Sequence, residues 1–164
     1  MAVLTITGLP DLFPGTEQFA GDLLAVGNPA PDFTGNTLDG RQIHLSDLKG
    51  SIVAVSFWAS WCEPCKAEMP VLQSAVLNYS DARFVVLAIN AGEEKSLVSS
   101  FVSGLKLTLP VILDPDKKIF KRYNVVVLPV TVWIDSQGIV RAEHIGSLDQ
   151  KLIASYMEML TRAP

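Results

Sequence analysis

"FWASWCEPCKAEMP", residues 57–70, contains both cysteines of the chain, Cys62 and Cys65, with two residues between them. The apolar run before them, Ile52–Trp58, is typical of a strand that is buried on both faces. The segment after them, from Cys65 to about Tyr79, has apolar residues at helical spacing. The two thiols therefore lie where a buried strand ends and a helix begins. A redox pair, two metal ligands and two structural core cysteines all have to be considered at such a position.

Length and composition limit the class of protein. The chain has 164 residues, of which 49% are hydrophobic and 18% charged, so we expect one globular domain with a substantial core. A net charge of −4 without a basic cluster argues against a nucleic-acid partner. The longest uncharged run, Ser51–Cys62, is too short to span a membrane. Residues 1–40 contain no Lys or Arg, so no signal peptide is recognisable. The protein is then either cytosolic, or it has an export signal or anchor that this sequence does not include.

The order of predicted elements indicates the fold class. Prolines interrupt residues 1–31, so we expect residues 1–26 to form an irregular extension with at most a short helix from Thr16. Leu38–Arg41 is a turn signal between two short extended pieces. Strand and helix patterns alternate after Ile52, and they predict an α/β domain over residues 27–164 with a mixed central sheet flanked by helices. The elements after the cysteine helix are expected at Phe84–Ile89, Ser96–Ser103, Val111–Leu113, Asp116–Tyr123, Thr131–Asp135, Ile139–His144 and from Asp149.

The spacing and position of the cysteines suit thiol chemistry. The unpaired N–H groups and the dipole at a helix N-terminus stabilise a thiolate at Cys62, which lowers its pKa and makes it reactive near neutral pH. Cys65 follows one helical turn later, close enough to form a disulfide. Pro64 suits the first helical turn, where its missing N–H is not needed. A mixed disulfide formed by Cys62 could therefore be resolved by Cys65.

The alternatives to a redox pair fit less well. A structural zinc site needs four ligands, and beyond the cysteines only His44 and His144 could contribute, far away in the sequence. Covalent haem attachment requires a histidine where the chain has Lys66. A peroxiredoxin-type peroxidase would have threonine at Ala59. Two purely structural cysteines would seldom have this spacing at a strand–helix junction. We expect no metal and no cofactor besides the Cys62–Cys65 disulfide, and we take both histidines for surface or strand residues.

Several motifs in the same order resemble those of a known family. The segment "FWASWCEPCKAEMP" is similar to the active-site segment of thioredoxin-fold proteins, in particular the TlpA/ResA-like thiol–disulfide oxidoreductases. "GNPAPDF" and "LDGRQIHLSDLKG" precede it, and "FVVLAINAGE", "LPVILDPD" and "YNVVVLPVTVWIDSQGIV" follow it. The resemblance covers about residues 27–147 and implies a thioredoxin fold with an N-terminal β-hairpin extension.

The resemblance also implies roles for residues around the thiols. Cys62 would be the exposed nucleophile and Cys65 the buried resolving thiol. Thioredoxin has a buried acid in the strand before the site, but the matching residue here is Ser56. Glu68, one turn after Cys65, matches the acid that similar proteins place near the cysteines, and we assign it the acid–base role. Glu63, between the cysteines, opposes a thiolate at Cys62, so we expect a moderate depression of that pKa.

The substrate-binding residues are expected on both sides of the thiols. Pro129 matches the cis-proline that faces the cysteines in the family, and a proline just before a strand fits the start of that strand. The backbone around Leu128 would then pair with an extended substrate segment. Trp61, Glu63 and Pro64 would complete the docking surface.

The expected activity is that of a thiol–disulfide oxidoreductase of the protein-disulfide reductase type. The substrates would be disulfides of exported proteins, such as apocytochrome c during cytochrome c maturation. A membrane or soluble thiol reductant would supply electrons to a monomeric protein in an extracytoplasmic or periplasmic compartment. The alternatives are a general cytosolic thioredoxin-like reductase and a thioredoxin-fold binding module without turnover. The intact cysteine pair argues against the binding module, and Ser56 with the N-terminal region argues against the plain thioredoxin.

Overall fold

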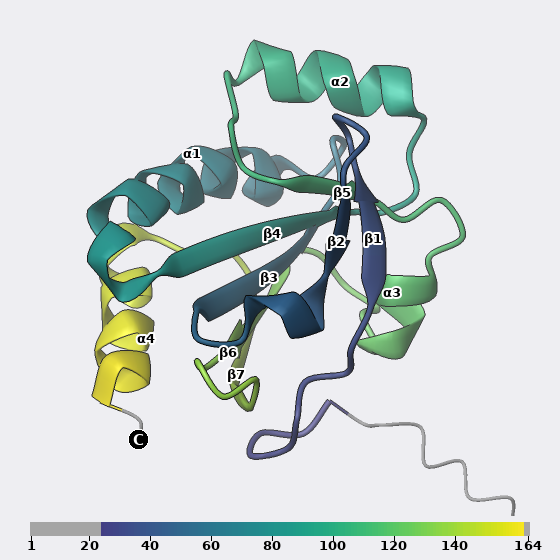
Figure 1. Cartoon of the computed structure of the whole chain (residues 1–164). Helices are drawn as coiled ribbons and strands as arrows, with labels where there is room; N and C mark the ends of the chain where they lie inside the picture. The colour runs from purple at the N-terminus through teal and green to yellow at the C-terminus, as the bar shows by residue number, and fades with distance from the viewer. Residues whose placement is uncertain (1–23, 163–164) are drawn as a thin grey trace, which may run out of the picture.

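The buried run that leads to the cysteines forms β3, Ile52–Trp58, near the middle of a seven-stranded sheet. The computed structural model describes residues 24–162 (Figure 1). The strands lie in the order β2-β1-β5-β4-β3-β6-β7. Their bounds besides β3 are β1 Thr34–Thr37, β2 Gln42–His44, β4 Phe84–Asn90, β5 Val111–Leu113, β6 Val130–Ile134 and β7 Val140–Ile145.

The pairing of the strands makes the sheet a mixed one. Strand β3 pairs in parallel with β4, which pairs in parallel with β5, and all other pairs are antiparallel. All seven residues of β3 are buried, as its almost entirely apolar sequence predicts. The predicted α/β domain with a mixed sheet between helices is therefore confirmed.

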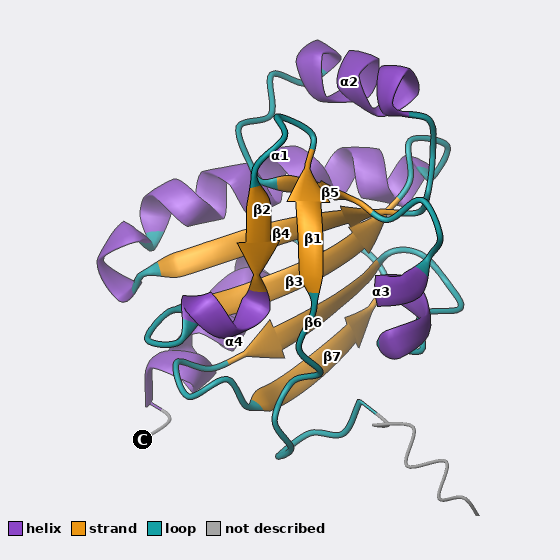
Figure 2. Ribbon diagram, turned by 45° about the vertical axis from the view of Figure 1, so that its right-hand side comes forward, coloured by secondary structure: helices purple, strands orange, loops and turns teal. Residues whose placement is uncertain are grey.

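Helices cover both faces of this sheet (Figure 2). Helices α1, Glu63–Asn78, and α4, Gln150–Arg162, pack on one face, where Leu72 and Ile153 cluster with Ala54 of β3. Helix α3, Lys118–Arg122, lies on the other face, and its Phe120 ring is 5.0 Å from that of Phe57. Helix α2, Lys95–Gly104, follows β4 and packs Phe101 against Trp58. Because β3 has helices on both faces, its carboxyl end and the cysteines are held on a rigid base.

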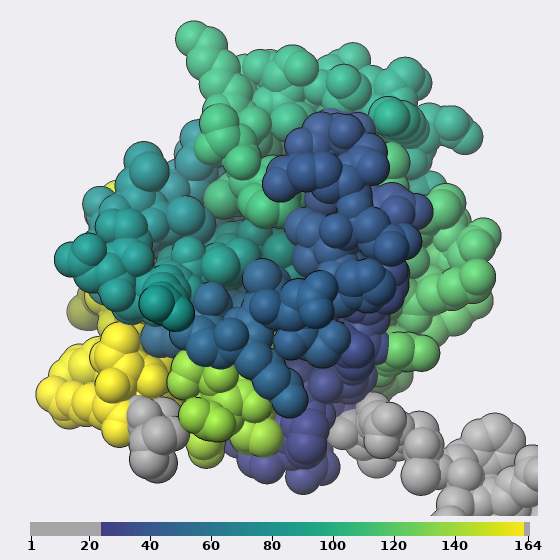
Figure 3. All heavy atoms as spheres, in the orientation of Figure 1, coloured from purple at the N-terminus to yellow at the C-terminus, as the bar shows by residue number. Residues whose placement is uncertain are grey.

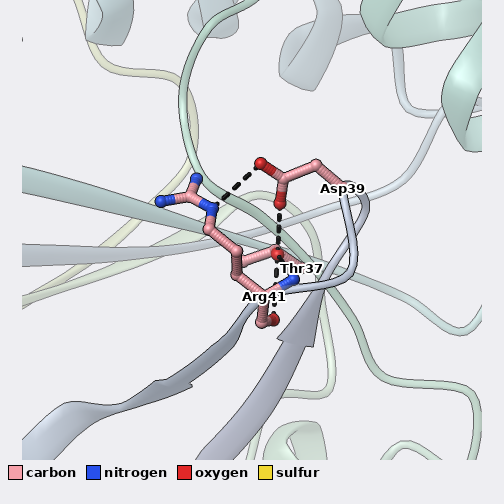
Figure 4. Close-up of polar contacts among 3 residues, drawn as sticks. All are labelled: Thr37, Asp39 and Arg41. Carbon is pink, nitrogen blue, oxygen red and sulfur yellow. Dashed lines mark hydrogen bonds and ion pairs between the residues drawn. The ribbon is translucent and has the colours of Figure 1, made fainter.

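The predicted N-terminal hairpin is present as β1 and β2. Its turn is held by Thr37, whose hydroxyl donates to one oxygen of Asp39, while Arg41 Nε donates to the other at 2.9 Å (Figure 4). These bonds hold the pKa of Asp39 below its ordinary value, and the largest cause is the Thr37 hydroxyl. Strand β1 also pairs with β5, so the hairpin is continuous with the main sheet.

The N-terminal part of the chain enters the fold beside the β6–β7 turn. The amide of Ala30 donates to the carbonyl oxygen of Gly138 at 2.9 Å. Nearby, the segment before β3 meets the same turn, where the Gly50 amide donates to Ser136 (Figure 3, blue against light green). The helix expected from Thr16 lies outside the described residues, and the division of the chain at residue 26 stays a prediction. Within residues 24–162, no helix combines the length and the apolarity needed to cross a bilayer.

Candidate active site

Cys62 and Cys65 form a disulfide at the N-terminus of α1, with their Cα atoms 5.2 Å apart. Cys62 is the N-cap of the helix, and its sulfur accepts a hydrogen bond from the Cys65 amide at 3.3 Å. Pro64 lies in the first turn, where no intrahelical partner for its nitrogen is required. An otherwise unpaired N–H group of the helix end thus points at the Cys62 sulfur, which is the arrangement that stabilises a thiolate.

The two cysteine residues differ less in exposure than the sequence led us to expect. Cys62 is 5% exposed and Cys65 is fully buried. The expectation of an exposed nucleophile is therefore wrong for this disulfide form, although Cys62 is the more accessible of the two. Cys62 belongs to a buried apolar cluster, and its amide donates to Ala59 while its carbonyl oxygen accepts from Lys66. Only a narrow part of Cys62 is left open to a substrate.

Glu68 lies one turn after Cys65 and is 1% exposed. Its Oε2 accepts a hydrogen bond from the Leu148 amide at 3.0 Å. Its Oε1 accepts from the hydroxyls of Ser56, at 3.2 Å, and Thr131, at 3.4 Å. Ser56 and Thr131 are opposite each other on β3 and β6, so the carboxyl group lies between α1 and the sheet. Ser56, which replaces the strand acid of thioredoxin, thus donates to a carboxylate that comes from the helix instead.

Burial raises the pKa of Glu68 to about 7, because a charged carboxylate loses most of its hydration there. The hydrogen bonds from Leu148, Ser56 and Thr131 favour the charged form but do not outweigh that loss. The carboxyl group therefore changes charge near neutral pH. Residues at positions i and i+3 of a helix lie on the same side, so Glu68 is a neighbour of Cys65. A group that gains or loses a proton near pH 7 is suited to general acid–base work.

The predicted substrate-binding residues surround the same end of the sheet. The Leu128–Pro129 peptide bond is cis, as predicted, and Pro129 directly precedes β6, whose Val130 pairs with Phe57. Trp61 is 69% exposed and, with Leu128, lines a pocket of about 250 Å³. Glu63 lies at the surface, where Lys66 Nζ is 2.5 Å from its carboxylate. The ammonium group of Lys66 offsets part of the negative charge that Glu63 places beside Cys62.

A further glutamate, which the sequence reasoning missed, holds the loop before the cysteines. The Oε2 of Glu93 accepts from the Ser60 amide at 2.7 Å and from Asn90 Nδ2 at 2.8 Å, and its Oε1 accepts from the Ser60 hydroxyl at 2.5 Å. Partial burial opposes the charge of Glu93, but these bonds outweigh it and hold its pKa below the ordinary value. A sequence signal for Glu93 was available. Ser60 follows β3 and Glu93 follows β4, and polar residues that follow neighbouring parallel strands meet at one edge of the sheet.

The histidines do not take part in the site. His44 is in β2 and His144 in β7, the two edge strands of the sheet. His44 Nδ1 contacts the Thr34 hydroxyl, and His144 Nδ1 contacts that of Tyr156. The described residues contain no cluster of three or more His, Cys, Asp or Glu side chains suited to a metal ion. A second pocket, of about 350 Å³ and lined by Val53 and Asp135, lies at the other end of β3 from the cysteines.

A Cys-x-x-Cys disulfide at the carboxyl end of a central strand, in a mixed sheet between helices, defines a thioredoxin-fold thiol–disulfide oxidoreductase. The chain belongs to the AhpC/TSA family, whose sequence profile matches residues 26–143. It is similar to the thiol-disulfide oxidoreductase ResA of Bacillus subtilis, with 35% identity over 143 residues, which are 87% of this chain and 80% of the relative.

Solved structures agree with this assignment. A thiol:disulfide interchange protein of the thioredoxin family from Chlorobium tepidum has a TM-score of 0.75 and 25% identity, covering 83% of this chain and 97% of the other. The exposed lipoprotein thioredoxin Etrx1 of Streptococcus pneumoniae has a TM-score of 0.70 and 31% identity, covering 79% of this chain and all of the other. The resemblance to ResA-like thioredoxin-fold proteins is thereby confirmed.

Proposed function

We propose that the chain reduces disulfides in exported proteins, such as apocytochrome c during cytochrome c maturation. The observation that carries the proposal is the Cys62–Cys65 disulfide at the helix N-terminus, followed one turn later by the buried carboxyl group of Glu68. A nucleophile, a resolving thiol and a proton acceptor are thus combined on one helical turn and a half. The name of the ResA relative states thiol–disulfide oxidoreduction, and the choice of substrates is our inference.

Reduction begins with the thiolate of Cys62, which attacks one sulfur of the substrate disulfide and forms a mixed disulfide. The other substrate sulfur leaves as a thiolate and takes up a proton. Glu68 in its charged form accepts the proton of Cys65, whose thiolate then attacks the sulfur of Cys62. The second substrate sulfur leaves as a thiolate and takes up a proton, which Glu68 can return, and the Cys62–Cys65 disulfide forms. Two electrons pass from the protein to the substrate, and a membrane or soluble thiol reductant restores the dithiol.

The substrate docks on the surface around the sulfurs. The exposed ring of Trp61 and the surface residues Glu63 and Pro64 flank Cys62 on its own loop and helix. Leu128 and Pro129 precede β6, and we expect the backbone there to pair with an extended substrate segment. We expect a monomer, because a substrate protein needs free access to this end of the sheet.

The compartment that we propose is extracytoplasmic. The similar pneumococcal protein is described as an exposed lipoprotein, and reduction of exported proteins has to take place where these proteins fold. Cell fractionation of the native protein tests this: recovery with the periplasm or with the outer face of the membrane supports the proposal. Recovery in the cytoplasm alone would favour the general thioredoxin-like reductase instead.

The activity is tested by differential alkylation and by a redox titration. Brief alkylation of the reduced protein, followed by mass mapping, should label mainly Cys62, because the helix end stabilises its thiolate and Cys65 is buried. Equal labelling of both cysteines would contradict the assigned roles.

Titration against glutathione should give a reduction potential within roughly 60 mV of the thioredoxin value, which corresponds to about a hundredfold in the equilibrium constant. A potential near that of DsbA, about −120 mV, would show an oxidant and contradict the reductase.

A further inference from the structure

Exposed apolar side chains gather at the cysteine end of the sheet. Trp61, Val126, Val127 and Ile145 are 69%, 86%, 47% and 65% exposed, and we call them the apolar rim. Trp61 lies between β3 and α1, the two valines lie between α3 and β6, and Ile145 ends β7 opposite Val130. Single exposed apolar residues need no explanation, but four from three separate segments around one site indicate a docking surface.

A pocket of about 250 Å³ lies within this rim. Trp61 and the segment Val125–Leu128 line it, together with Ala91 and Phe120, which are largely buried. Pockets for small molecules are usually larger, from about 300 Å³ upward. The size and the apolar lining therefore suit a single large side chain of a bound polypeptide.

Two lysines give this pocket a positive edge. Lys117, the N-cap of α3, and Lys121, within the helix, both line it, and the Lys121 amide donates to the Lys117 carbonyl oxygen at 3.0 Å. Within residues 24–162, no carboxylate is within 4 Å of either ammonium group. The neighbouring Lys118, in contrast, pairs with Asp116 at 3.4 Å.

The stability of α3 does not explain this lysine pair. Lys117 is the N-cap of α3, where the helix dipole disfavours a cation. The chain as a whole has a net charge of −4, so a pair of cations at this pocket is not a consequence of a basic composition. Cations that lack a carboxylate partner, at the edge of an apolar pocket beside a reactive sulfur, are suited to meet a negative charge on a bound partner.

We propose that this surface selects substrate segments in which a large apolar residue and an acidic residue lie next to the disulfide cysteine. The apolar side chain enters the pocket, and the acidic side chain pairs with Lys117 and Lys121. The inference rests on the proposed reductase function and adds the chemical class of its preferred substrates. A second copy of the chain is a poorer occupant, because a twofold contact would bring the lysine pairs of both copies together.

Three peptides test the proposal, each with one intramolecular disulfide and a leucine beside the first cysteine. They differ only in the residue that follows this leucine, which is Asp, Asn or Lys. Stopped-flow measurements with the reduced protein give a second-order rate constant for each peptide. We expect the Asp peptide to react about tenfold faster than the Lys peptide at low salt. The ratio should fall toward one in about 0.5 M NaCl, where charges are screened beyond roughly 4 Å.

Two double variants distinguish the effect of the lysine pair on the rate ratio from the effect of the protein's net charge. In Lys117→Gln/Lys121→Gln the Asp-to-Lys ratio should fall to about two or less at low salt. The control Lys118→Gln/Lys151→Gln removes the same charge outside the pocket and should keep the wild-type ratio. Both double variants are first compared with wild type by circular dichroism, so that a loss of fold is not mistaken for a loss of selection.

Each of the following outcomes would contradict the proposed substrate preference. Equal rates for the three peptides would show that the lysine pair does not select, and they would leave the reductase function intact. A ratio that survives in Lys117→Gln/Lys121→Gln would place the selection elsewhere. Binding of phosphatidylglycerol vesicles that depends on the two lysines, without a peptide preference, would assign the surface to a membrane. Dimers in sedimentation analysis that dissociate in this variant would assign it to a second copy. Failure to reduce any peptide would overturn the proposed function as well.

Discussion

Two glutamates flank the cysteine pair, and their surroundings push their pKa values in opposite directions. Glu68 is enclosed between α1 and the sheet, and its burial raises its pKa to about 7. Glu93 lies at the edge of the fold after β4, and strong hydrogen bonds hold its pKa below the ordinary value. Both carboxylates accept three hydrogen bonds, so the number of donors does not explain the difference.

The opposite pKa shifts follow from the exposure of each carboxylate to water and from the lengths of its hydrogen bonds. Glu93 keeps part of its hydration, and its bonds are 2.5–2.8 Å long, whereas those of Glu68 are 3.0–3.4 Å long in a dry site. Long bonds compensate less for lost hydration. Glu93 is therefore a fixed anion that positions the loop of Ser60 and Trp61, while Glu68 is a group that exchanges a proton. We therefore propose a structural role for Glu93 and a chemical role for Glu68.

Cys65→Ser gives the largest expected effect. In this background it can also be tested whether Glu68 acts on Cys65 alone, whereas Glu93 affects the attack by Cys62. The variant should lose turnover by on the order of 10³-fold or more and accumulate mixed disulfides at Cys62, because the resolving thiol is absent. Adding Glu68→Gln should not slow formation of the mixed disulfide further, whereas adding Glu93→Gln should. Quenched-flow trapping of the mixed disulfide measures this step. A strong slowing by Glu68→Gln in this background would show that Glu68 acts on Cys62.

The pH dependence of stability should reveal the raised pKa of Glu68. A carboxyl group with a pKa of 4.5 when unfolded and about 7 when folded binds its proton more tightly in the native state. Stability is then full below pH 4.5 and falls as the pH rises to 7, by about 3 kcal/mol in total. Glu68→Gln lacks this loss, so its stability relative to wild type should rise by that amount between about pH 4 and pH 8.

Urea unfolding of the oxidised proteins at several pH values measures this difference, because all other groups titrate alike in both proteins. Glu143→Gln is the matched control, since Glu143 is exposed on β7 and should leave the pH dependence unchanged. Parallel stability curves for wild type and Glu68→Gln would mean that Glu68 has an ordinary pKa despite its burial.

The kinetic effect of Glu68→Gln should be smaller but specific. Loss of a general base slows proton transfer typically by about 10²-fold or more, but other bases, including water, can replace part of it near neutral pH. We expect resolution of the mixed disulfide to slow by roughly tenfold, with a changed pH profile between about pH 6 and pH 9. Disulfide exchange followed across this range measures it. Wild-type rates at every pH would leave Glu68 without an acid–base role.

The sequence predicts one of these glutamates and not the other, for a physical reason. Glu68 is one turn from Cys65 on the same helix, so helical spacing places it beside the thiols, and the family resemblance suggested its role. Glu93 is distant along the chain, and only the pairing of β3 with β4 brings it to Ser60. The buried run of β3 and the hairpin turn at Asp39 were likewise predicted from local pattern. The burial of Cys62 was not, because it depends on the packing of segments that are far apart in the sequence.

Glu93→Gln gives the smallest expected effect and completes the comparison. The substitution replaces one acceptor oxygen by an NH₂ group that faces the donors of Ser60 or Asn90, so the loop before Cys62 should become less well fixed. We expect attack by Cys62 to slow by roughly threefold, since small displacements of a nucleophile reduce its rate. The shape of the pH profile between about pH 6 and pH 9 should stay that of wild type, because Glu93 is charged throughout this range. Glu94→Gln, an exposed neighbour, is the control. A pH profile that changes in Glu93→Gln as it does in Glu68→Gln would mean that both carboxyl groups exchange protons, and the contrast between a positioning anion and a proton carrier would be wrong.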